Sequence, residues 1–217
     1  MNWLTKSAII LGISIGATIS AQATSYTIGE SVQVKENGVS PDKVVTINSS
    51  TLGQQTVYAG VTQLLIDGVA TNSFCVDPYQ WASGSTETYT VSDLASVPSP
   101  AMGTAAAETV SKLWAKYYQQ ALSSDSTAAG LQIAIWETVA GSNFSVVGTD
   151  YGASGMITAA NSSNIEANLV AVSSPSYQDY VVQNVPDAGA TLVLLGLGLV
   201  AVAIVGRKAR PVAVTID

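Results

Sequence analysis

Two apolar segments near the ends of the chain confine its folded part to the region between them. Met1 to Ala23 has the order of a secretory signal, with a charged start at Lys6, an apolar core and a small-residue cleavage site, Ala21-Gln22-Ala23. Near the other end, Ala188 to Gly206 carries no charge, and a run of about 20 apolar residues is what a bilayer-spanning helix needs. The sequence therefore predicts an exported protein whose mature chain begins near Thr24.

A basic cluster follows the C-terminal apolar segment. Arg207, Lys208 and Arg210 come directly after it, and such clusters mark the cytoplasmic side of a membrane span. A buried core helix is the alternative for the apolar run, but the adjacent basic cluster favours a membrane anchor. This interpretation places residues 24–184 outside the cytoplasm as one domain and leaves 211–217 as a short tail.

A short proline motif precedes the apolar segment. Val185-Pro186-Asp187 is followed by small residues, and the motif, the apolar segment and the basic cluster together span residues 185–210. This tail resembles the PEP-CTERM group of C-terminal sorting signals, in the variant that begins Val-Pro-Asp. The resemblance implies an exosortase-type transpeptidase as partner, a Gram-negative-type envelope and often a biofilm setting. An unprocessed membrane anchor is the alternative, because the chain continues to Asp217 and such tails usually stop sooner.

The composition of the domain restricts the functions open to it. Fourteen acidic residues from Glu30 to Asp187 stand against four lysines and no arginine, so we expect no binding to nucleic acid. The chain has no histidine, which removes Ser-His-Asp triads, Cys-His dyads and the commonest zinc ligand. Phosphate-binding glycine loops and calcium loops are missing as well, and we expect no cofactor and no metal. Paired carboxylates for glycoside cleavage stay an alternative that no particular residues support.

The first half of the domain is rich in β-branched residues and turn signals, whereas the second half has apolar residues at helical spacing. Strands are expected over residues 26–35, 44–48, 55–67 and 70–76, with breaks at Asn37-Gly38 and Pro41 and a hairpin turn at Asp67-Gly68. Helices are expected from Pro100 onward, from Ser126 to Gly141 and over residues 155–172. Strands followed by helices predict an α+β fold, with a β-rich, sandwich-like N-terminal lobe, a helical segment and a C-terminal transmembrane helix.

The single cysteine, Cys75, follows Phe74 at the end of a predicted strand. Exported proteins use cysteine mostly in pairs, so an odd one indicates an intermolecular partner or a thiol with a chemical task. The alternative is a small buried hydrophobic residue. Asp77 could share the strand face of Cys75, where its charge would raise the pKa of the thiol. This argues against a free nucleophilic cysteine enzyme.

A glutamine in a predicted helix suggests what that thiol does. Gln132 and Trp136 lie four residues apart on one flank of the helix. If Cys75 meets that flank, its sulfur can attack the carboxamide carbon of Gln132, expel ammonia and leave a thioester, provided that packing holds the groups close together. Trp136 would then shield the bond from water. The alternatives are an ordinary glutamine on the flank of a helix and a core tryptophan.

The segments Phe74-Cys75 and Gln132-Ile133-Ala134-Ile135-Trp136 resemble those of bacterial thioester domains, in which a cysteine after an aromatic residue pairs with the glutamine of a Gln-x-Ala-Ile-Trp helix. The likeness covers roughly residues 58–144. It implies a β-rich lobe with a helical lobe and covalent capture of an amine-bearing surface protein or polysaccharide. The bond would form and react once, so the protein would not be an enzyme with multiple turnovers.

Two functions of different class follow from these observations. The first is an exported, surface-anchored adhesin-like module with a Cys75–Gln132 thioester. The second is a non-reactive structural or carbohydrate-binding protein of the extracellular matrix, in which Cys75 is buried and reduced. Aromatic side chains for a sugar-binding surface would come from Trp81, Tyr89, Tyr117 and Tyr118, although scattered aromatic residues more often belong to the core.

Overall fold

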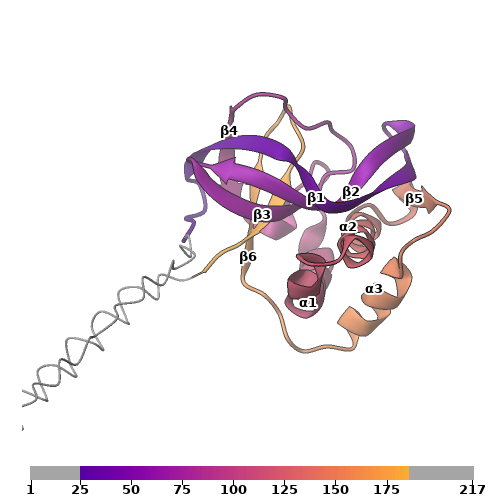
Figure 1. Cartoon of the computed structure of the whole chain (residues 1–217). Coiled ribbons are helices and arrows are strands. Elements are labelled where there is room, and N and C mark those ends of the chain that lie inside the picture. Colours follow the sequence, from indigo (N-terminus) through magenta and orange to yellow (C-terminus); the bar gives the residue numbers. More distant parts are fainter. Residues whose placement is uncertain (1–24, 186–217) are drawn as a thin grey trace, which may run out of the picture.

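A computed structural model describes residues 25–185. Figure 1 shows long, curved strands with helices gathered on one side of them. The predicted signal segment, most of the sorting motif, and the predicted membrane helix and basic cluster over residues 188–210 lie outside the described residues. Within residues 25–185, no helix is both long and apolar enough to cross a bilayer.

Seven strands form a single antiparallel sheet within the described part of the chain. Their bounds are β1 Ser31–Ser49, β2 Gly53–Ile66, β3 Val69–Cys75, β4 Glu87–Ser92, β5 Phe144–Val147, β6 Leu169–Ser173 and β7 Tyr180–Gln183. The order across the sheet is β2-β3-β7-β6-β4-β1-β5, and β1 also pairs with β2. That extra pairing closes six of the strands into a ring, because β1 is long enough to have a partner at each edge. The predicted α+β class is confirmed, but the expected sandwich-like lobe is wrong, since the described strands form one sheet rather than two.

The strand β1 joins two segments that the sequence predicts as separate strands. Val32 and Val34 are buried near its start, Val45 and Ile47 are buried near its end, and each pair follows the two-residue period of a strand. The middle of the strand contains register shifts between Glu36 and Asp42. Bulges of this kind absorb extra residues and bend a strand without ending it, so the expected breaks at Asn37-Gly38 and Pro41 are bulges rather than turns.

The predicted hairpin turn is confirmed. β2 ends at Ile66, Asp67 and Gly68 both have positive φ angles of 49° and 81°, and β3 begins at Val69. The Asp67 carboxylate also accepts a hydrogen bond of 2.8 Å from the backbone N–H of Gln33. The turn fixes the register of β3 and thereby the position of Cys75 at its far end.

Three α-helices lie within residues 25–185: α1 Gly103–Ala121, α2 Asp125–Ala140 and α3 Ala153–Asn161. Short 3-10 turns precede α1 at Leu94–Ser96 and follow α2 at Gly141–Asn143. The start of α2 is capped by Ser124, whose Oγ accepts from the backbone N–H of Thr127 at 3.3 Å. The third predicted helix is wrong in its second half, because Leu169–Ser173 forms β6. Sequence reasoning also missed β4, β5 and β7.

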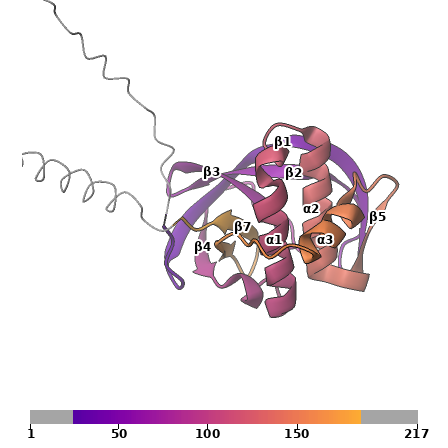
Figure 2. The same ribbon diagram turned by 90° about the horizontal axis from the view of Figure 1, so that it is seen from below.

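The helix α2 is buried on all sides along its middle. Every residue from Ala128 to Trp136 is buried, and the helix contacts β1, β2 and β3 as well as α1 and α3. Figure 2 shows it between the other two helices. Gly130 permits this close packing, since a Cβ atom there would lie 2.5 Å from the carbonyl oxygen of Tyr151. The flank on which the sequence places Gln132 and Trp136 is therefore buried.

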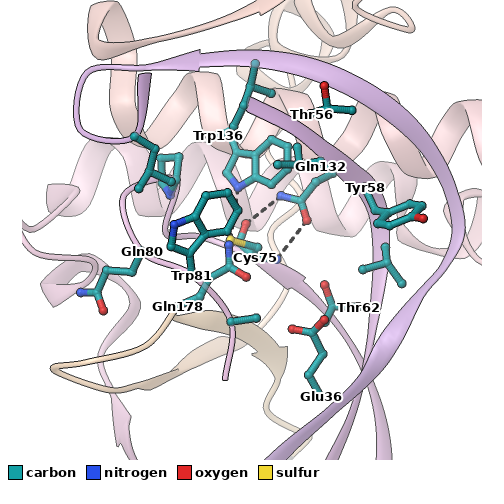
Figure 3. Close-up of a pocket in the computed structure, with 16 residues that line it drawn as sticks. Glu36, Thr56, Tyr58, Thr62, Cys75, Gln80, Trp81, Gln132, Trp136 and Gln178 are labelled. Atoms are coloured by element: carbon teal, nitrogen blue, oxygen red, sulfur yellow. Dashed lines mark hydrogen bonds between the residues drawn. The ribbon is translucent and has the colours of Figure 1, made fainter. Parts of the chain in front are cut away.

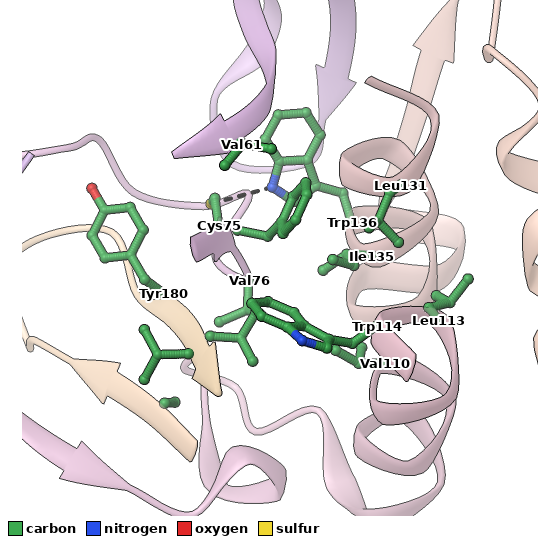
Figure 4. Packing of buried hydrophobic residues seen from close by; sticks show 14 of the residues in the cluster. Val61, Cys75, Val76, Val110, Leu113, Trp114, Leu131, Ile135, Trp136 and Tyr180 are labelled. Atoms are coloured by element: carbon green, nitrogen blue, oxygen red, sulfur yellow. Dashed lines mark hydrogen bonds between the residues drawn. The ribbon is translucent and has the colours of Figure 1, made fainter. Parts of the chain in front are cut away.

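The core joins the end of β3 to the helices. Phe74 meets Trp114 of α1 edge to face, with ring centroids 5.7 Å apart, and Trp114 stacks on Tyr118 at 4.3 Å. Apolar side chains from the sheet and from both long helices lie around Trp114 (Figure 4). This packing positions Cys75, the residue that follows Phe74, relative to α2.

Candidate functional site

Cys75 is the last residue of β3, at a place where the sheet leaves one edge of the strand without a neighbour. β2 pairs with β3 only as far as Thr62 and Ser73, while on the other side Cys75 is still opposite Tyr180 of β7. The backbone N–H and C=O of a buried residue need partners. At Cys75, which is 3% exposed, these partners come from a side chain instead of a strand.

That side chain is Gln132 of α2, which is 1% exposed. Its Oε1 accepts from the backbone N–H of Cys75 at 3.0 Å, and its Nε2 donates to the backbone carbonyl of Cys75 at 2.8 Å (Figure 3). The two bonds fix the orientation of the carboxamide, because exchanging its nitrogen and oxygen would bring two donors together and two acceptors together. The structure thus brings together the two residues that the sequence singled out. We call this pair the inner clamp.

Trp136 lies against the sulfur of the same cysteine. Its indole Nε1–H donates to Cys75 Sγ at 3.2 Å (Figure 4), and the backbone N–H of Asp77 donates to the same sulfur at 3.3 Å. The thiol in turn donates to the backbone carbonyl of Asp77 at 3.3 Å. Trp136 is 4% exposed and packs against Phe144. The three predicted site residues therefore form one buried group.

The surroundings keep the thiol protonated. Burial raises the pKa of Cys75 well above its ordinary value, and the negative charge of Asp77 raises it further. The hydrogen bonds from Trp136 and from the Asp77 backbone lower it, but less than burial raises it. The predicted direction of the Asp77 effect is confirmed, and a cysteine that must be a free thiolate in its resting state does not fit this site.

A second buried acid lies beside Asp77 and carried no recognisable sequence signal. Asp179 is 4% exposed, accepts from the backbone N–H of Ser174 at 2.8 Å and receives the N–H of Val76 on its backbone carbonyl. Burial raises the pKa of Asp179 to about 7, and the charge of Asp77 adds to the effect. Two carboxyl groups close to one another in an apolar setting disfavour simultaneous ionisation.

A cavity of about 250 Å³ opens over the inner clamp. Cys75, Gln132 and Trp136 line its deep part, and the exposed aromatic side chains of Tyr58 and Trp81 lie on opposite sides of it (Figure 3). Its polar lining comes from Glu36, Thr56, Thr62, Gln80 and Gln178. A small molecule or a single side chain from a partner can thus reach the otherwise buried pair.

The aromatic residues proposed for sugar binding do not gather at one surface. Trp81 is at the cavity, but Tyr89 is 2% exposed and contacts Tyr180 in the core. Tyr118 stacks on Trp114, and Tyr117 is half-buried beside the core. The grouping of all four in a binding surface is wrong. Tyr58 and Glu36, which do line the cavity, were missed because only the curvature of β1 and β2 brings them to it.

Comparison with known proteins identifies the C-terminal tail. Residues 184–208 match the VPDSG-CTERM motif, which includes the predicted Val185-Pro186-Asp187 element. This supports a sorting tail of the PEP-CTERM type, an exported or cell-surface protein, and an exosortase-type system as the partner that sorts it. No curated protein and no solved structure matches the chain. The match is confined to the tail. The function of the domain before it has to be argued from the arrangement of its own residues.

Proposed function

We propose that the exported domain is a covalent attachment module, in which Cys75 and Gln132 form an internal thioester that reacts with an amine on a surface protein or polysaccharide. The inner clamp carries this proposal. It holds the carboxamide of Gln132 by both ends against the residue that bears the only thiol of the chain.

The clamp favours approach of the sulfur to the face of the carboxamide. A group that bonds both the N–H and the C=O of one strand residue lies close to the plane of the sheet, whereas the side chain of that residue leaves the plane. A nucleophile must attack a carbonyl group through its face. Holding the reacting atoms together in this way supplies the proximity that an inert amide otherwise lacks.

The bond changes of thioester formation balance without a co-reactant. Cys75 Sγ bonds to the Gln132 carboxamide carbon, the bond from that carbon to Nε2 breaks, and the thiol proton leaves with the nitrogen as part of ammonia. Negative charge develops on Oε1, which already accepts from the Cys75 backbone N–H. The indole N–H of Trp136 stabilises the sulfur while it loses its proton.

An arriving amine then completes the attachment. Its nitrogen bonds to the same carbon, the carbon–sulfur bond breaks, and the sulfur regains a proton as a thiol. The product is an amide bond between Gln132 and the partner. The near-complete burial of Cys75 and Gln132 limits attack by water while the thioester waits.

A non-reactive binding module is the second candidate. The observation that favours it is the cavity, whose exposed Trp81 and Tyr58 would suit the apolar face of a sugar, with Gln80 and Gln178 as hydrogen-bonding groups. In this case Gln132 only completes the edge of β3, and Cys75 stays a buried thiol.

Intact mass separates the two candidates. We would compare the purified full chain with its Cys75→Ala variant, before and after methylamine treatment. Any processing of the chain ends is common to both and does not affect the comparison. The attachment module predicts a deficit of one ammonia, present only with Cys75 and replaced by the mass of one methylamine. A chain of full mass, with one thiol that reacts on unfolding, would rule it out in favour of the binding module.

A further inference from the structure

We propose that Glu36 determines which nucleophile reaches the thioester, by binding a primary ammonium group on a flexible stem in the cavity. The inference rests on the proposed function and adds the group that selects the partner. In chemical terms, the favoured substrate is an alkylammonium side chain rather than a hydroxyl group or an uncharged amine.

The position of Glu36 is tied to the position of the cysteine. The Tyr180 hydroxyl donates to Glu36 Oε2 at 2.6 Å, and Tyr180 is the residue of β7 that lies opposite Cys75 in the sheet. A shift of β7 relative to β3 would therefore change the position of Glu36 and of Cys75 together. One hydrogen bond occupies only part of the acceptor capacity of a carboxylate, which leaves Glu36 able to bind a second donor.

The cavity has one acidic side chain and no basic one. Glu36 is the only carboxylate among its lining residues, and no lysine or arginine lines it. Figure 3 shows Glu36 beside Thr62, below Cys75 and Gln132 in this view. A carboxylate without a cationic partner, next to a low-dielectric pocket, attracts a cation more strongly than it would in open water.

The aromatic walls suit the same kind of substrate. Tyr58 and Trp81 are 62% and 52% exposed and flank the cavity from opposite sides. Aromatic faces attract an ammonium group and pack against the apolar stem of a long amine. They would therefore guide a lysine-like side chain inward with its charged end toward Glu36.

The protons of the second step then have defined destinations. An ammonium group loses two protons when it becomes the nitrogen of an amide. One of these protons ends on Cys75 Sγ as the thiol reforms, and the other passes through Glu36 to water. Uncharged nucleophiles do not use the carboxylate for binding.

The test compares two amines on three forms of the full chain: unmodified, Glu36→Gln and Glu108→Gln. Glu108 is exposed on α1 and lies away from this cavity, so its substitution removes the same charge at a remote site. The probes are Nα-acetyl-lysine amide, which is cationic at neutral pH, and hydroxylamine, which is uncharged there. Mass spectrometry first measures the loss of ammonia in each form and then the rate at which each probe adds.

We expect Glu36→Gln to slow the lysine derivative about tenfold, to leave hydroxylamine unchanged, and Glu108→Gln to affect neither. Equal slowing of both probes, or no slowing of the lysine derivative, would overturn the role of Glu36 while leaving the thioester intact. Absence of ammonia loss in the unmodified chain would overturn the attachment function and this inference together.

A measurement on the unmodified chain guards against a Glu36→Gln variant that fails to fold. Added salt should slow the lysine derivative and leave the hydroxylamine rate constant, because screening weakens attraction between charges only. The same salt response for both probes would count against the proposal.

Discussion

Gln132 and Asn184 each hold the backbone of one distant residue by the same two hydrogen bonds. Gln132 bonds the N–H and C=O of Cys75 at 3.0 and 2.8 Å, and Asn184 bonds those of Tyr26 at 2.9 and 3.2 Å. We call the second pair the outer clamp. It ties the start of the described chain to the residue at which the sorting-motif match begins.

The two clamps differ in surroundings rather than in geometry. The inner clamp is almost fully buried and has a thiol on the clamped residue, whereas Asn184 is half-buried and the chain has no second cysteine. A two-point amide clamp is thus a structural device that completes the pairing of a strand or a chain end. Under the proposed function, reaction requires the additional thiol, the indole donor and a buried setting.

The largest difference should come from replacing each amide by the acid of the same shape. In a Cys75→Ala background, which removes any thioester, we expect Gln132→Glu to lower the free energy of unfolding by about 4 kcal/mol near pH 8, because a carboxylate would be buried without a donor for the Cys75 carbonyl. Protonation restores that donor, so the loss should shrink as the pH falls. Urea unfolding at several pH values measures this, and a pH-independent loss would contradict it.

Solution pH should also change the free energy of unfolding, through the buried carboxyl group of Asp179. Its pKa is raised from 3.8 to about 7 in the folded protein, so the folded state favours its protonated form. The stabilisation is therefore complete below the ordinary pKa of 3.8 and is lost as the pH rises from there through about 7, with a total of about 4 kcal/mol. Denaturant midpoints between about pH 3.5 and 8 measure the loss.

Asp179→Asn should flatten that pH dependence. Asp150→Asn is the matched control, since hydrogen bonds from Gly152 and Ser154 lower the pKa of Asp150 and its contribution changes only in acid. Equal pH profiles for Asp179→Asn and the parent would show that Asp179 does not carry the effect.

Two tryptophans sharpen the distinction between a structural and a reactive clamp. Trp136→Phe removes the N–H that donates to the sulfur, and we expect ammonia loss after refolding to slow about tenfold, equivalent to about 1.4 kcal/mol in the barrier. In Trp114→Phe the rate should not change, because the buried Nε1 of Trp114 has no hydrogen-bond partner in the described structure. Mass spectra at timed intervals measure both rates. Similar slowing in both variants would point to general loosening of the core.

The smallest effect should come from the outer clamp. Asn184→Asp removes the donor to the Tyr26 carbonyl, but water can reach this half-buried site and solvate the new charge. We expect a loss of about 0.5–1 kcal/mol with little dependence on pH. It is measured in the same Cys75→Ala background as Gln132→Glu, and a loss as large as that of the inner clamp would remove the contrast between them.

Local signals in the sequence are sufficient for several features of this protein. The hairpin at Asp67-Gly68 depends on two adjacent residues that tolerate positive φ, and α1 depends on apolar spacing within a single segment. The sorting motif is likewise contiguous, and residues 184–208 match it directly. Cys75 and Gln132 could be chosen as candidate site residues from the sequence because each lies in a short motif of its own.

Tertiary structure decided what those residues contact. The ring of strands closes only because β6 and β7, from the end of the domain, insert between β3 and β4, and such long-range pairing leaves little trace in local composition. Gln132 is buried because α2 packs on both the sheet and its neighbouring helices, and it meets Cys75 because β2 stops pairing at Thr62. Sequence alone thus determined which groups are present, whereas the unfilled edge of β3 determined that a side-chain amide lies against the backbone of the residue that bears the thiol.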